Sequence, residues 1–145
     1  MDPVRVLVVE DNRVDAKLLR MAFQIEEEEG VDLVVAETGP KALALLRSQP
    51  LPDLVVLDWN LPGGNGLEVL RAIRADAGLK DLPVVMFSSS PSELTEQQAR
   101  KADVSADGYF TKPFDYDDFV HMARLILHRY ERRPVAGSMS RLAAS

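Results

Sequence analysis

The chain has 145 residues, 46% of them hydrophobic, which is enough for the packed core of one domain but not of two. A formal net charge of −6 disfavours nucleic acid as a partner, because binding to a phosphate backbone requires a basic surface. The lack of cysteine excludes disulfides and zinc–thiolate sites, and no apolar run has the length of a membrane span or the pattern of a signal peptide. We therefore expect a soluble, cytoplasmic protein that binds neither nucleic acid nor membrane.

Short apolar runs alternate with helical patterns along the chain. Each run is bounded by polar or turn-forming residues, as expected for strands buried on both faces of a parallel sheet. The five predicted strands cover residues 4–9, 31–36, 54–57, 83–87 and 108–111. Helical spacing of apolar residues follows each strand, and the five predicted helices begin near residues 12, 40, 66, 92 and 116. This alternation predicts an α/β fold with a doubly wound, five-stranded parallel sheet and right-handed crossovers.

The fourth predicted helix has little apolar surface. Residues 92–102 carry only three apolar side chains, at Leu94, Ala99 and Ala102. Because helices in proteins are stabilised mainly by a packed face, this helix should be the most loosely held in the fold.

The last predicted helix, residues 116–131, is apolar around much of its circumference. Only His121 and Arg124 interrupt the apolar residues between positions 119 and 127. Such a helix must bury a second face, and a partner subunit is the simplest candidate. We predict a homodimer through the fourth helix, the fifth strand and the fifth helix, with contacts from Phe119, Val120, Ala123 and Leu127. Residues 132–145 have no periodicity, which predicts a disordered tail or an extended arm after a single domain of residues 1–131.

The candidate site residues follow four of the five predicted strands, the first, third, fourth and fifth. The carboxyl ends of parallel strands meet at one edge of the sheet, where open α/β sheets bind their ligands. The side chains expected at this edge are Glu10, Asp11, Asp58, Ser88 and Lys112. Taken singly, each has a simpler interpretation, because an acid after a strand commonly caps a turn and a lysine is commonly solvated.

Three carboxylates at one edge require a cation. Two like unit charges ~4 Å apart repel by roughly 4 kcal/mol at an effective dielectric of about 20. Because only oxygen ligands are offered, a hard ion such as Mg²⁺ is favoured. A carboxylate held against Mg²⁺, with an ammonium and a hydroxyl opposite, can accept a phosphoryl group, and backbone amides after Asp58 and Ser88 can bind its oxygens.

Four motifs carry a resemblance to a known family. They are Val9-Glu10-Asp11-Asn12, Leu57-Asp58-Trp59-Asn60-Leu61-Pro62, Phe87-Ser88-Ser89 and Gly108-Tyr109-Phe110-Thr111-Lys112-Pro113-Phe114. Together they resemble the receiver domain of two-component response regulators, over roughly residues 4–131. The resemblance implies a flavodoxin-like fold with strand order 2-1-3-4-5. It also implies a phosphoacceptor signalling protein rather than an enzyme, with a sensor histidine kinase or a phosphotransfer protein as partner.

The same resemblance implies a role for each acidic residue of the edge. Asp58 would accept the phosphoryl group from a phosphohistidine of the kinase. Mg²⁺ would be bound by Asp11, Asp58 and the backbone carbonyl of Asn60, with Glu10 acting through water. A narrower similarity, through the apolar last helix and Arg129, Arg132 and Arg133, is to single-domain regulators paired with phytochrome-type histidine kinases.

The resemblance further implies how the phosphoryl group would be bound and sensed. The side chains of Ser88 and Lys112 would contact its oxygens, together with the backbone amides that follow Asp58 and Ser88, those of Trp59, Asn60 and Ser89. Tyr109 would rotate inward as Ser88 moves toward the phosphoryl group. The Lys112–Pro113 peptide bond would be cis.

Two other functions remain open. A phosphohydrolase could use Asp58 as its nucleophile, although such enzymes usually carry a second acid two residues later, where this chain has Asn60. A receiver that is not phosphorylated could act only as an interaction module, although every expected site group is present.

Overall fold

The computed structural model describes residues 4–26, 31–48, 50–62 and 64–130 of the chain. Its centre is a parallel sheet of five strands, β1 (Val4–Val9), β2 (Val31–Ala36), β3 (Leu54–Asp58), β6 (Val84–Ser88) and β7 (Gly108–Thr111). Their spatial order is β2-β1-β3-β6-β7, so the first to fifth strands of this sheet lie in the predicted order 2-1-3-4-5. The predicted doubly wound fold is confirmed.

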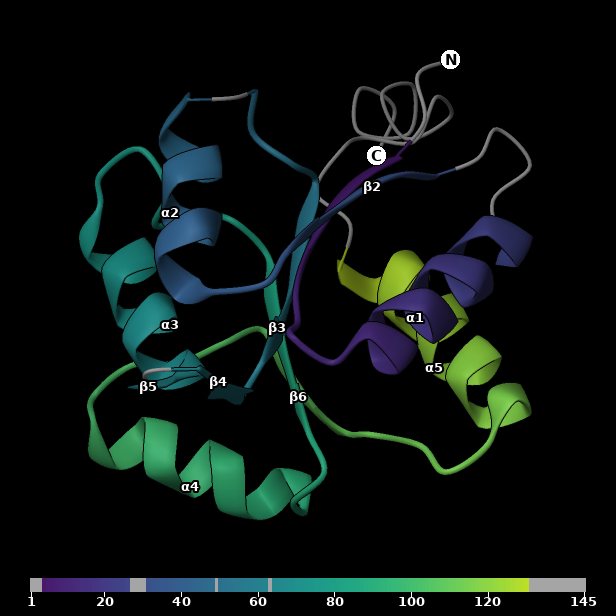
Figure 1. Ribbon diagram of the computed structural model, residues 1–145. Helices are drawn as coiled ribbons and strands as arrows, with labels where there is room; N and C mark the ends of the chain where they lie inside the picture. The colour runs from purple at the N-terminus through teal and green to yellow at the C-terminus, as the bar shows by residue number, and fades with distance from the viewer. Residues whose placement is uncertain (1–3, 27–30, 49, 63, 131–145) are drawn as a thin grey trace, which may run out of the picture.

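Helices cover both faces of the sheet. Figure 1 shows α1 (Arg13–Glu26) and α5 (Tyr116–Tyr130) on one face, and α2 (Gly39–Ser48) and α3 (Gly66–Ala75) on the other. The remaining helix, α4 (Ser92–Lys101), contacts β6 and β7. No helix in the described part of the chain is both long enough and apolar enough to cross a membrane.

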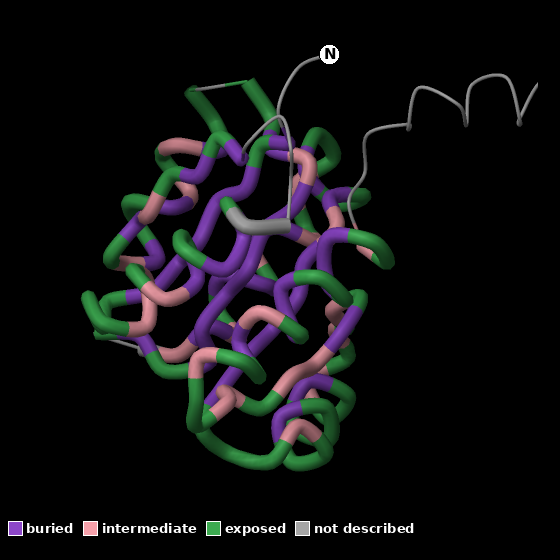
Figure 2. The backbone as a smooth tube through the Cα atoms, turned by 90° about the vertical axis from the view of Figure 1, so that its right-hand side faces the viewer, coloured by how far each residue is buried: buried purple, intermediate pink, exposed green. Residues whose placement is uncertain are grey.

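The strands alternate their side chains between two hydrophobic cores. On β1, Val4, Val6 and Val8 pack in the core under α1 and α5, whereas Leu7 and Val9 pack in the core under α2 and α3. The buried segments run through the middle of the molecule with exposed segments around them (Figure 2). Burial on both faces explains why β3 and β6 are apolar up to their last residue rather than alternating between apolar and polar residues.

A short antiparallel hairpin that the sequence did not predict follows β3. In it, β4 (Asn60–Leu61) pairs with β5 (Gly64–Asn65), and α3 begins at the next residue. A Cβ atom at Gly66 would collide with the backbone carbonyl oxygen of Asp58. Glycine is therefore what lets α3 begin so close to the end of β3.

Three of the four predicted dimer contacts on α5 are wrong, and the fourth, Val120, stays a prediction because it is only partly buried. Phe119, Ala123 and Leu127 are at most 2% exposed and belong to the chain's own core, and Val120 packs against the same core. The physical reason is that α5 has two neighbours within the chain, because it packs on α1 as well as on the sheet. The second apolar face is thus buried without a partner subunit. The predicted tail, residues 132–145, and the domain boundary at residue 131 lie outside the described residues.

The fourth helix has few buried residues, in agreement with its sequence. In α4 only Thr95 and Ala99 are buried, and Leu94 is half exposed. A helix with so small a packed face is held mainly through its contacts with β6 and β7.

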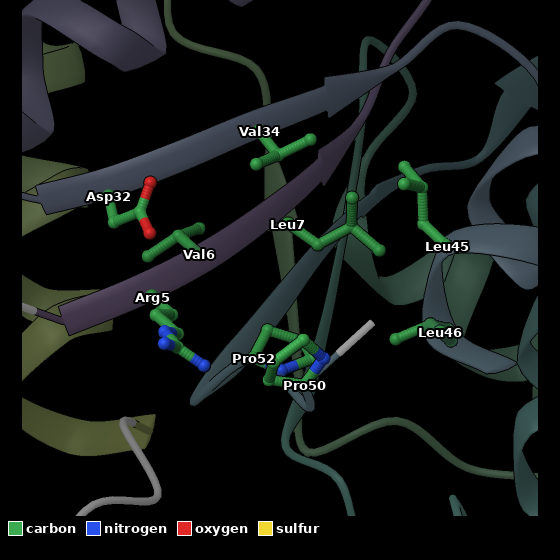
Figure 3. A pocket seen from close by; sticks show the side chains of 9 residues that line it. All are labelled: Arg5, Val6, Leu7, Asp32, Val34, Leu45, Leu46, Pro50 and Pro52. Carbon is green, nitrogen blue, oxygen red and sulfur yellow. The ribbon is translucent and has the colours of Figure 1, made fainter. Parts of the chain in front are cut away.

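A cavity of about 300 Å³ lies between the sheet and α2 (Figure 3). It is lined by β1, β2, α2 and the segment before β3, including the side chains of Arg5, Asp32, Leu45, Pro50 and Pro52. None of the polar residues predicted at the carboxyl ends of the strands lines it. The candidate site residues therefore lie outside this cavity.

Candidate functional site

The sheet register brings the predicted polar residues to one edge. Asp58 is the last residue of β3 and pairs with Phe87, so Ser88, the last residue of β6, lies one position beyond it. Glu10 follows β1 directly, and its backbone N–H donates to the carbonyl of Ala36. Lys112 follows β7, and its backbone N–H donates to the carbonyl of Ser88. Four strands thus deliver four functional groups to the same end of the sheet, as predicted.

Three carboxylates surround the ammonium of Lys112. Its Nζ lies 2.8 Å from Asp15 Oδ2, 3.1 Å from Glu10 Oε2 and 3.2 Å from Asp58 Oδ2. The contacts to Asp15 and Asp58 are hydrogen bonds. The Glu10 and Asp58 side chains are almost fully buried, and that of Lys112 is 16% exposed. These ion pairs are therefore poorly screened by solvent.

Asp15 is a member of the site that the sequence prediction missed. It lies in the first turn of α1, and acids are common in first turns for a reason unrelated to function, because they interact with the helix dipole. Only the fold shows that this turn faces the loop after β7, 97 positions away in sequence. The one signal in the sequence was that Asp15 lies only a few positions after Glu10 and Asp11, the acids that follow β1.

Burial and crowding perturb the ionisation of Glu10. Its pKa is raised from 4.5 to about 8, first by burial and then by the neighbouring carboxylate of Asp58. Its Oε1 accepts a hydrogen bond from the backbone N–H of Asn12 at 2.9 Å. Its buried Oε2 makes no hydrogen bond within the described residues, although Lys112 Nζ is 3.1 Å away. One carboxylate oxygen of the site is therefore short of a partner.

Lys112 remains an ammonium despite its burial. Burial by itself would lower its pKa, but the hydrogen bond to Asp15 and the charges of Asp58 and Glu10 outweigh that effect and raise the pKa above its usual value. The ammonium also lies 5.0 Å from the centre of the Phe87 ring. It is a fixed positive charge beside Asp58.

Three acids at this edge are spaced to hold a cation. One ligand oxygen each from Glu10, Asp11 and Asp58 lie within 4.8 Å of one another, and Asp11 is exposed. The unpartnered Oε2 of Glu10 and a ligand set made only of oxygen atoms fit a hard divalent ion. The exposed Asp11 leaves the group open to solvent on one side, as binding of an ion and a substrate requires.

The backbone amides after Asp58 differ from the prediction in one respect. The N–H of Asn60 donates to Asp58 Oδ1 at 3.1 Å, so it already points at the carboxylate. The N–H of Trp59 instead donates to the carbonyl of Phe87 at 3.0 Å, within the ladder between β3 and β6. The Trp59 N–H is therefore engaged in sheet pairing, which continues one residue past the strand end, and its role as a phosphate-binding donor stays a prediction. Its side chain is buried in the core under α2 and α3.

The hydroxyl groups of Ser88 and Tyr109 both accept backbone hydrogen bonds. Ser88 is buried, and its Oγ accepts from the N–H of Ser90 at 3.1 Å, whereas Ser89 is exposed. The Tyr109 hydroxyl accepts from the N–H of Ala106 at 2.9 Å, and the ring packs partly buried against the core under α2 and α3. The ring of Tyr109 is thus partly buried in this structure, and its inward rotation on phosphorylation stays a prediction.

The Lys112–Pro113 bond is trans, and the predicted cis bond is wrong. For a bond before proline the trans form is ordinarily favoured by about 0.5–1 kcal/mol. Lys112 reaches all three carboxylates with the trans bond, so the site geometry does not need the cis form.

Comparison with known proteins identifies the class to which this fold and this edge belong. A model of the response regulator receiver domain matches residues 6–124. The chain therefore belongs to the receiver domain family of two-component response regulators, which act in phosphorelay signalling. The family resemblance predicted from the four sequence motifs is confirmed.

Curated relatives are more than a third identical to the chain over the residues that align. They include the phosphate regulon transcriptional regulatory protein PhoB of Klebsiella pneumoniae, 37% identical over 125 residues, and the DNA-binding response regulator MtrA of Mycobacterium tuberculosis, 38% identical over 130 residues. These matches cover 86% and 90% of this chain but 52% and 53% of the relatives. The chain spans about half the length of the curated relatives that it matches.

Similar solved structures include three response regulators whose names bear on the site or the partner. The phosphorylated cyanobacterial phytochrome response regulator RcpA is 30% identical, with a TM-score of 0.79 over 89% of this chain and 94% of that one. The Mn²⁺-bound form of Rcp1 is 28% identical, with a TM-score of 0.76 over 92% and 98% of the two chains. The bacteriophytochrome response regulator RtBRR is 27% identical, with a TM-score of 0.70 over 99% and 90%.

Proposed function

We propose that Asp58 is the phosphoacceptor of this receiver domain. The observation that carries the proposal is the buried Asp58 carboxylate, which accepts hydrogen bonds from the Lys112 ammonium and the Asn60 amide beside two further acids. A carboxylate oxygen of Asp58 would attack the phosphorus of a phosphohistidine, the phosphorus–nitrogen bond would break, and the imidazole would leave with the bonding electron pair. The product is an acyl phosphate on Asp58.

The other groups of the edge would bind the transferred phosphoryl group. Lys112 would balance the charge of one oxygen, and the Ser88 hydroxyl and the Asn60 and Ser89 amides would donate hydrogen bonds to others. Mg²⁺, held by Glu10, Asp11, Asp58 and the Asn60 carbonyl, would supply further neutralisation of the phosphoryl charge. The Mn²⁺-bound form of the similar Rcp1 supports a divalent ion at this edge.

Two features support a partner kinase as the phosphodonor. Val14 at the start of α1 is 67% exposed, and Phe114 in the loop before α5 is fully exposed. Both apolar side chains come from segments that follow the carboxyl ends of strands, so they flank Asp58 and offer contact area to a docked protein. Because RcpA and RtBRR are phytochrome response regulators, we propose a phytochrome-type histidine kinase, or a phosphotransfer protein, as the partner.

Labelling with a small phosphodonor tests the proposed chemistry. The protein is incubated with Mg²⁺ and acetyl phosphate, and intact mass shows whether one phosphoryl group is added. We expect a label that hydroxylamine removes, that needs the divalent ion and that is absent from Asp58→Asn. The matched control is Asp53→Asn, an acid just before the same strand. Equal labelling of Asp58→Asn and wild type would refute the proposal.

A phosphohydrolase is less well supported by the same site. The position two residues after Asp58 is Asn60, whose exposed side chain has no proton to give a leaving group as an acid would. Steady release of phosphate from a simple phosphate ester, lost in Asp58→Asn, would favour the hydrolase instead. If Asp58→Asn fully replaced the wild type in the cell, that would favour a pure interaction module.

A further inference from the structure

Asp15 makes the shortest contact to the Lys112 ammonium, at 2.8 Å. The other two carboxylates on this ammonium belong to Asp58 and Glu10, and both lie in the group of acids that is spaced to hold a cation. Asp15 does not belong to that group. Of the three carboxylates on Lys112, it is therefore the one that neither the metal ion nor the phosphoryl group would engage.

The charges around Lys112 change as Asp58 reacts. One oxygen of Asp58 forms the new bond to phosphorus. The product is an acyl phosphate, so the Asp58 side chain is no longer a carboxylate with a full negative charge. Lys112 then has to turn one N–H toward a phosphoryl oxygen while it loses its partner on Asp58. An ammonium has three N–H donors, so a bond to Asp15 leaves two for the phosphoryl group.

The local structure of α1 fixes Asp15 in place. The side chain of Asn12 caps the helix, because its Oδ1 accepts from the N–H groups of Val14 at 2.9 Å and of Asp15 at 3.0 Å. The Asn12 N–H in turn donates to Glu10 Oε1. The backbone of Asp15 is thus tied through Asn12 to the end of β1, and the side chain of Asp15 is only 21% exposed.

We propose that Asp15 is a positioning residue that holds the Lys112 ammonium over the phosphoryl site while Asp58 is converted into its acyl phosphate. This inference rests on the proposed function of Asp58. Asp15 does not touch the phosphoryl group and acts through Lys112. The opposite effect, in which Asp15 only neutralises Lys112 and hinders an anionic donor, makes the opposite prediction for the rate.

The test compares Asp15→Asn with wild type in the rate of Asp58 labelling by acetyl phosphate and Mg²⁺. We expect Asp15→Asn to be slower by about tenfold, as for other groups that orient a functional side chain, and Asp15→Glu to recover part of the rate. The matched control is Asp117→Asn, which removes an exposed acid from the first turn of α5 and should stay within about twofold of wild type.

Two further measurements separate positioning from a structural role. In a Lys112→Ala background, adding Asp15→Asn should change the rate by less than about twofold, because Asp15 then has nothing to hold. The Mg²⁺ affinity of Asp15→Asn, followed by Trp59 fluorescence, should also stay within about twofold of wild type. Urea unfolding should give similar midpoints for Asp15→Asn and Asp117→Asn.

Several outcomes would overturn the inference. They are a rate for Asp15→Asn equal to or above wild type, an unchanged effect of Asp15→Asn in the Lys112→Ala background, or a loss of Mg²⁺ binding in Asp15→Asn. If wild type is labelled but Asp15→Asn matches it, the role of Asp15 fails and the proposed function stands. If wild type itself is not labelled, the proposed function fails.

Discussion

Glu10 combines burial with a negatively charged neighbour. Its pKa is raised to about 8 by burial and by Asp58, whereas in an unfolded chain it titrates near 4.5. The metal-free folded protein therefore holds a proton that the unfolded chain releases between these two values. The contribution of Glu10 to stability is fully present below pH 4.5 and is lost as the pH rises through about 8.

This difference predicts a pH-dependent stability. We expect the free energy of unfolding of the metal-free protein to fall from about pH 5 to about pH 9. It should fall less in Glu10→Gln, because the glutamine side chain does not titrate in this range. Urea unfolding in the presence of EDTA measures this. Added Mg²⁺ should restore stability at the high end of the range, because the ion binds the ionised carboxylate. Parallel pH profiles for wild type and Glu10→Gln would contradict the prediction.

At the scale of the elements, one arginine joins α3 to two loops, one before β6 and one before β7. Arg74, in the last turn of α3, donates to the carbonyls of Lys80, Leu82 and Ser105 and to the carboxylate of Asp107, at 2.7–3.0 Å. Asp107 Oδ2 also accepts from the N–H of Val84 at 2.8 Å. The guanidinium thus fixes the loop between α4 and β7, which carries the Ala106 amide that bonds the Tyr109 hydroxyl.

Replacing Arg74 should loosen this connection. We expect Arg74→Lys to lower the free energy of unfolding by about 2 kcal/mol, because a lysine ammonium cannot match the fork of the guanidinium and leaves carbonyls unpaired. Urea unfolding measures the change. Arg71→Lys, an exposed position on the same helix, is the control and should stay within about 0.5 kcal/mol of wild type. Equal stabilities of the two variants would show that the hydrogen bonds of the Arg74 guanidinium do not stabilise the fold.

At the scale of the whole molecule, the exposed apolar side chains beside Asp58 predict how the partner docks. We expect Val14→Asp and Phe114→Ala to slow phosphotransfer from a phosphorylated histidine kinase by about tenfold or more, since both remove apolar contact area. Labelling by acetyl phosphate should be unchanged, because neither side chain contacts Asp58 or Lys112. Leu94→Ala, an exposed apolar residue on α4, is the control. An equal loss of both reactions would place the defect in the site itself.

The proposed homodimer depends on a different surface of the molecule. A hollow of about 620 Å³ lies beside α5 and is lined by Phe110, Pro113, His121, Leu125 and His128, among others. We propose that the dimer forms through this face, with exposed residues of α5 in place of the buried ones that the sequence predicted. Leu125 is 40% exposed at the hollow, so Leu125→Asp should shift the protein toward monomer in light scattering. A wild type that is monomeric with and without phosphorylation would exclude the dimer.

The sequence by itself determined the strands of the sheet and most of the site, and the family resemblance supplied the strand order. Strands buried on both faces leave unbroken apolar runs, and the residue after each run must lie at one edge, so Glu10, Asp58, Ser88 and Lys112 could be placed together without coordinates. The pattern of apolar and polar residues along a segment reflects how that segment is buried and where it ends. It was therefore enough to predict each strand and the residue that follows it.

Only the tertiary structure decided which side chains meet across the chain. Asp15 reaches Lys112 because α1 begins at the same edge of the sheet where β7 ends, a contact that neither segment's pattern encodes. The apolar face of α5 is buried by α1, not by a second subunit, because helix packing depends on which helices share a face of the sheet. The Trp59 amide is taken up by pairing with β6 for the same reason. Contacts between elements depend on their arrangement in space, and periodicity along one element does not contain that information.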